Sequence, residues 1–131
     1  LIEQNPDKYA LGFSEIHPRD VAYPDCFYPR KEFKRINRDM LFNFNRLISM
    51  GAFISRPGTP MTKRWLDELN RRLDLKLEDL KKSPGNIWGD SDGYPIKWNA
   101  ILGQIFHPLC LVYNEFIIHD NRIKPVLKDY R

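Results

Sequence analysis

The sequence predicts an α/β fold, in which short buried strands alternate with amphipathic helices. Apolar runs of strand length occupy residues 9–13 and 47–55. A leucine-rich stretch with helical spacing follows at residues 60–82 and ends before a proline–glycine pair. Strand-like residues return at 109–119. Strands and helices therefore alternate along the chain, which is typical of α/β domains.

Length and composition predict one globular domain. The chain has 131 residues, which suffices for one core, and we expect residues 1–131 to form a single domain. Its formal net charge of +4 suits an anionic ligand or an acidic membrane surface, with an ordinary solvated surface as the alternative. Cys26 and Cys110 lie far apart, which excludes a disulfide-dense scaffold and a cysteine zinc site.

These features favour a reducing, cytoplasmic location. The sequence has no apolar run of the roughly 18–20 residues that a membrane span needs, and no recognisable signal peptide. It opens at Leu1 without an initiator methionine. We therefore expect the chain to be a fragment or one segment of a longer polypeptide.

The N-terminal third predicts a strand, a loop and a helix. The apolar run at 9–13 leaves the core at Ser14 and enters a proline-rich loop at 17–29. Loops of that length are often binding loops, although some are merely long connections. Residues 31–45 alternate basic with apolar side chains at a spacing that fits a helix or two helical turns.

The strand at 47–55 and the helix after it have the clearest boundary signals. Pro57 and Gly58 predict a turn, and Thr59 followed by Pro60 predicts a helix N-terminus. We expect this helix to continue to residue 82. Its apolar stripe predicts core packing, with a zipper as the alternative, and consists of Trp65, Leu66, Leu69, Leu73, Leu77 and Leu80.

The C-terminal third predicts one more helix and the closing strands. A helix is expected to begin at Pro95 and to end at the His-Pro pair at 107–108, where the histidine would interact with the helix dipole. Residues 109–113 and 115–119 predict two strands, or one strand bent at Asn114.

Gly51 is the first candidate for function. A glycine inside a strand pattern marks a bulge, or a place where a ligand or another backbone comes close. The Ser49, Met50 and Gly51 end of this strand is therefore a candidate site. The alternative is a core strand in which the glycine relieves crowding.

Asp90, Asp92 and His119 are candidates for metal chemistry. The two carboxylates lie on a glycine-rich loop that can converge them on a divalent cation, although aspartates also serve as turn formers. His119 ends an apolar strand and precedes Asp120, so it emerges where active sites of α/β proteins gather. The alternative for His119 is a half-buried side chain with one hydrogen-bonded nitrogen.

Trp88 and Tyr94 flank the aspartate loop and suit a sugar-binding surface. Aromatic faces stack on sugar rings, and carboxylates accept hydrogen bonds from hydroxyls. Trp98 has the helical phase of a core residue. Nucleic-acid binding is not expected, because the basic residues are scattered and form no recognition motif.

Two segments resemble a known family. Residues 45–60, followed by Trp65 and Leu66 on a helix, resemble the donor-sugar strand of GT-A-fold glycosyltransferases. Residues 94–109 resemble the C-terminal part of the bacterial capsular and lipopolysaccharide enzymes that have a DXD-containing sugar-binding region. The likeness covers most of the chain after Arg38. The family's DXD strand is missing from this chain, which implies that the upstream half of the catalytic domain is missing too.

The resemblance implies a GT-A-like α/β fold with a mixed sheet and flanking helices. It implies a glycosyltransferase that moves a sugar from a nucleotide-sugar donor to a glycan acceptor, with Mn²⁺ or Mg²⁺ on the diphosphate. Ser49, Met50 and Gly51 would contact the donor, and His119 would complete the metal site.

The aspartate loop differs from the family pattern, because Asp90 and Asp92 follow the long helix instead of a strand. They are therefore assigned a catalytic-base role, or a role in binding the acceptor together with Trp88 and Tyr94. A location in the cytoplasm, with peripheral association at the inner membrane face, fits polysaccharide synthesis. The alternatives are a non-catalytic glycan-binding module and a basic domain that binds protein or nucleic acid.

Overall fold

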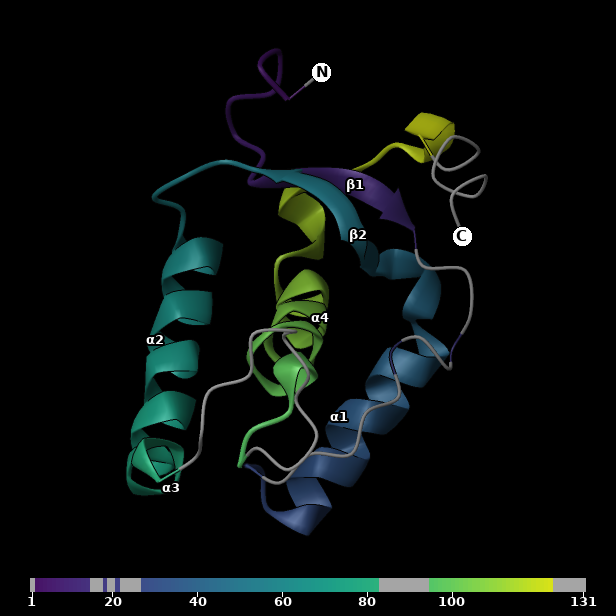
Figure 1. Ribbon diagram of the computed structural model, residues 1–131. Coiled ribbons are helices and arrows are strands. Elements are labelled where there is room, and N and C mark those ends of the chain that lie inside the picture. The colour runs from purple at the N-terminus through teal and green to yellow at the C-terminus, as the bar shows by residue number, and fades with distance from the viewer. Residues whose placement is uncertain (1, 15–17, 19–20, 22–26, 83–94, 124–131) are drawn as a thin grey trace.

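The fold is a small mixed sheet that lies over a layer of helices (Figure 1). The computed structural model describes residues 2–14, 18, 21, 27–82 and 95–123. The strands are β1 (Ala10–Ser14), β2 (Ile48–Ser55) and β3 (Ile117–His119). Their order is β2-β1-β3, with β2 antiparallel and β3 parallel to β1. The predicted α/β class with a mixed sheet and flanking helices is confirmed.

The helices form the second layer, with α4 between α1 and α2 (Figure 1). They are α1 (Arg30–Phe42), α2 (Pro60–Leu75), α3 (Leu77–Lys81) and α4 (Gly103–Val112). Short 3-10 turns occupy Phe44–Arg46, Trp98–Ile101, Asn114–Phe116 and Asn121–Ile123. The turn at 44–46 leads directly into β2, and the turn at 114–116 leads directly into β3.

The core lies between the sheet and α4. Ile105, Phe106, Leu109 and Cys110 of α4 are buried there. From the sheet and its approach, the buried partners are Ala10, Leu47, Ile48 and Ile117. Phe106 also stacks on Phe53 of β2 and contacts Trp65 of α2, which ties three elements together.

The start of α2 follows the predicted capping rules. The Thr59 side chain accepts a hydrogen bond from the backbone N–H of Thr62 at 3.2 Å, and Pro60 occupies the first helical position. Gly58 has a φ of +70°, which glycine adopts without strain. The predicted strands at 9–13 and 47–55 and the first helix are also confirmed within a few residues.

The predicted strand at 109–113 is wrong. These residues continue α4 to Val112, and Pro108 lies inside that helix. The start at Pro95 is also wrong, because a 3-10 turn precedes α4 and the α-helix begins at Gly103. His107 is mid-helix and 1% exposed, so it is not the helix-terminal residue that the sequence predicted. A helix buried on most sides has no apolar periodicity to separate it from a strand.

The predicted helix at 60–82 is interrupted. Lys76, with a φ of −110° and ψ of 8°, separates α2 from α3. The predicted core stripe holds for Trp65 and Leu69, which pack against the core. It fails for Leu66 and Leu77, which are 57% and 43% exposed, because the far side and distal end of this helix pair lie away from the sheet.

Candidate functional site

The carboxyl ends of β1 and β3 meet at one end of the sheet, because the two strands are parallel. Gly12 pairs with His119 in this ladder. The Ser14 hydroxyl lies 3.2 Å from Nδ1 of His119, and the Ser14 backbone N–H donates to Oδ1 of Asn121 at 2.9 Å. In α/β proteins ligands gather outside the carboxyl ends of strands. We call Ser14, Asn114, His119 and Asn121 the polar end of the sheet.

His119 is held from two sides. Asn114 donates one amide hydrogen to the Arg46 carbonyl at 3.0 Å and lies 3.4 Å from Nε2 of His119. His119 is exposed by surface area, but partial desolvation of its ring lowers its pKa from the ordinary 6.5, which favours the neutral imidazole. If Asn114 donates to Nε2, the ring proton sits on Nδ1 and is donated to Ser14.

Asp120 does not join His119 as a ligand pair. Its carboxylate accepts hydrogen bonds from the Arg122 side chain, including one from Nε at 2.8 Å, and these hold the pKa of Asp120 at about 2. Within the described residues, no group of three His, Cys, Asp or Glu side chains could hold a metal ion. His119 is therefore a single potential ligand in this part of the chain.

The predicted donor segment lies where the β1–β2 ladder opens. Gly12 pairs with Phe53, but the next pair joins Ser14 to Ile48, so β2 contributes more residues than β1 between these pairs. The predicted irregularity at Gly51 is confirmed. The N–H of Gly51 donates to the Ser49 hydroxyl at 3.0 Å.

Gly51 is the exposed member of the predicted donor trio. Ser49 is 2% exposed, and Met50 is partly buried against the core. A ligand that arrives from solvent would therefore meet the Gly51 backbone first. Gly12 of β1 is a second glycine in this region, and an added Cβ there would lie 3.0 Å from side-chain atoms of Ile48.

The remaining predicted site residues lie outside the described part of the chain. These are Trp88, Asp90, Asp92 and Tyr94. The side chain of Trp98 is likewise not described. The catalytic and acceptor-binding roles of the aspartate loop therefore stay predictions.

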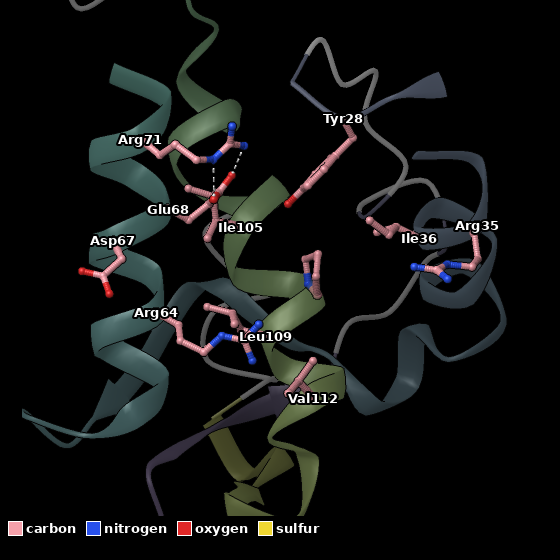
Figure 2. A pocket seen from close by; sticks show the side chains of 11 residues that line it. Tyr28, Arg35, Ile36, Arg64, Asp67, Glu68, Arg71, Ile105, Leu109 and Val112 are labelled. Carbon is pink, nitrogen blue, oxygen red and sulfur yellow. Dashed lines mark hydrogen bonds and ion pairs between the residues drawn. The ribbon is translucent and has the colours of Figure 1, made fainter. Parts of the chain in front are cut away.

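A cleft between the helices was not predicted. It has a volume of about 660 Å³ and lies between α1, α2 and α4 (Figure 2). Its apolar lining consists of Ile36, Ile105, Pro108, Leu109 and Val112. Its polar lining consists of Tyr28, Arg35, Arg64, Asp67, Glu68 and Arg71. These residues come from three separate segments, 28–36, 64–71 and 105–112, so their convergence has no signal in the sequence.

The charges of the cleft are partly paired. Hydrogen bonds from Arg71 and Arg72 to Glu68 lower the pKa of its carboxyl group, and Asp67 pairs with Lys63 at 2.9 Å. Arg35 and Arg64 turn toward the cleft in Figure 2. Neither has an ion pair within the described residues. The cleft thus offers guanidinium groups above an apolar floor, which suits an anionic ligand.

Comparisons of this chain with protein-family models, curated proteins and solved structures found no match. Across the described residues, no helix combines the length and the apolar character needed to cross a membrane.

Proposed function

We propose that this chain is part of a glycosyltransferase that transfers a sugar from a nucleotide-sugar donor to a glycan acceptor. The observation that carries the proposal is the opening of the β1–β2 ladder at Gly51, close to the polar end of the sheet. Ser14 pairs with Ile48 on one side and contacts His119 on the other, so it links the two regions. An exposed backbone without a side chain lets a sugar ring approach closely.

The proposed roles follow from exposure and hydrogen bonding. The Gly51 backbone would contact the donor sugar, with Ser49 holding the turn and Met50 supporting it from the core. The neutral imidazole of His119 would face the donor from the carboxyl end of β3. A GT-A-type arrangement belongs to the proposal through the resemblance, as do Trp88 and Tyr94 as acceptor contacts and Asp90 and Asp92 as catalytic groups.

A Mn²⁺ or Mg²⁺ ion is part of the same proposal. Such an ion neutralises the charge of a departing diphosphate. His119 alone does not make a site for either ion, because both ions prefer oxygen ligands. Further ligands would have to come from residues outside the described part of the chain. The proposed role of this chain does not depend on any step at the metal.

The proposal is tested by thermal unfolding with UDP- and GDP-sugars in the presence of Mn²⁺. A ligand at 100 times its dissociation constant stabilises the folded state by about 2.7 kcal/mol, which raises the melting temperature measurably. Gly51→Val should abolish this shift while leaving the unliganded melting temperature nearly unchanged, because Gly51 is exposed.

Ser55→Val is the matched control, since it places the same side chain at an exposed position of β2 outside the opening. It should retain the shift. The absence of a shift with every nucleotide sugar would contradict the proposal, and so would a Gly51→Val variant that responds like the parent chain.

A further inference from the structure

One face of α1 concentrates positive charge, with Arg35 at its edge beside the cleft. Lys31, Lys34, Arg35 and Arg38 recur at the spacing of one helical face, and all four are exposed. With Arg30 and the two acids Glu32 and Asp39, α1 has a net charge of +3, from five basic and two acidic residues, in a chain whose total is +4. Most of the net charge of the molecule is therefore carried by one helix.

The same face ends in exposed apolar surface. Phe42 is 80% exposed and follows Arg38 by one helical turn. Beside it, a hollow of about 320 Å³ is lined by Phe33, Leu41 and Phe42, with Lys34, Asn37 and Arg38 also lining it. Moving an exposed phenylalanine side chain out of water is favourable, and the boundary between lipid headgroups and acyl chains offers it an apolar environment. We call Lys31, Lys34, Arg35, Arg38 and Phe42 the basic face of α1.

We infer that the basic face of α1 docks on an anionic phospholipid surface. Lysine and arginine side chains would contact lipid phosphates, and Phe42 would enter the interface beside the apolar hollow. Charge complementarity favours a phospholipid surface as the partner. The basic side chains match the anionic headgroups, and the apolar end of the face, at Phe42, matches the acyl chains beneath them. The inference gives the expected peripheral membrane association a defined surface, and it does not depend on the proposed function.

Co-sedimentation with vesicles tests the inference. The chain should sediment with an equal mixture of phosphatidylcholine and phosphatidylglycerol, and not with phosphatidylcholine alone, at low salt. Lys34→Glu/Arg38→Glu should weaken binding at least about tenfold, since each basic residue near such a surface contributes a factor of about five.

The matched control is Lys81→Glu/Lys82→Glu on and just after α3, which makes the same charge change at two exposed lysines. It should keep most of the binding. Phe42→Ser should weaken vesicle binding without a change in charge, whereas Leu66→Ser, at another exposed apolar residue, should not. Circular dichroism and melting temperatures would verify that each variant is folded.

Three results would overturn the inference. The first is equal sedimentation with neutral and anionic vesicles, or none with either. The second is an equal loss in the α1 and α3 charge variants, which would indicate diffuse attraction. The third is unchanged vesicle binding in Lys34→Glu/Arg38→Glu together with lost binding to single-stranded RNA, which would assign the basic face to nucleic acid.

Discussion

Arg72 is buried, although arginine side chains usually lie at the protein surface. Its side chain is fully buried, and its guanidinium lies 4.8 Å from the ring centroids of both Phe27 and Tyr28. It donates to the Ala100 carbonyl at 2.8 Å and to Gln104 at 3.2 Å, and it pairs with Glu68. Arg72 therefore joins α2 to the segment that leads into α4.

We expect Arg72→Ala to destabilise the fold by about 3–5 kcal/mol, because it takes the guanidinium donor away from the buried acceptors of Ala100 and Gln104 and removes one of the two guanidinium groups that bind Glu68. Arg71→Ala is the control: Arg71 pairs with the same carboxylate but its side chain is 45% exposed, so the cost should stay below about 1 kcal/mol. Urea unfolding measures both. Similar costs for the two variants would contradict the structural role of Arg72.

His119 gives the fold a pH dependence of definite sign. Partial desolvation of the ring lowers its folded-state pKa below the 6.5 of an ordinary histidine, so the unfolded chain binds the proton more readily. The free energy of unfolding should therefore fall as pH drops below about 6.5, and this loss should be complete below the folded-state pKa.

The test compares the parent chain with His119→Gln in urea at several pH values between about 5 and 7.5. The variant should show a flatter pH dependence over this window. A slope that persists unchanged in His119→Gln would mean that other groups carry the pH dependence and that the His119 environment differs from the one described.

At the scale of elements, local signals predicted α2 far better than α4. The start of α2 depends on Thr59 and Pro60, which act on their immediate neighbours, so the sequence locates it. α4 is buried along most of its length, with Gln104 and His107 among its buried residues, and its burial comes from α1, α2 and the sheet together. Its run of apolar residues matches a buried strand equally well.

The cap of α2 provides a prediction at this scale. Thr59→Ala should cost about 1 kcal/mol, because the N–H of Thr62 loses its acceptor at the helix start. Thr59→Ser keeps the hydroxyl and should stay close to the parent chain. Thermal unfolding checks both variants. Equal stability of Thr59→Ala and the parent chain would mean that water replaces the cap without cost.

At the scale of the whole molecule, the candidate site combines residues that the sequence separates. His119 was recognisable because it ends an apolar run, and Gly51 because it interrupts one. Ser14 gave no signal, since its contact with His119 exists only because β1 and β3 pair in parallel across more than a hundred residues. Asn114 contacts His119 locally, from the 3-10 turn just before β3, and nothing in the sequence marked that contact. The helix cleft was unpredictable for the same reason, because three separate segments of the chain have to be in place before it exists.

The position of β1 between β2 and β3 also affects how the chain is made. The ribosome synthesises β1 and then β2, but the partner on the other edge of β1 is β3, at Ile117–His119, which follows only after α2, α3 and α4. Until that segment emerges, Ala10, Leu11 and Gly12 lack the strand that pairs with them in the finished fold. A nascent chain would thus carry an open, apolar strand edge on β1 from the synthesis of β1 until that of β3, a state that favours aggregation and chaperone binding.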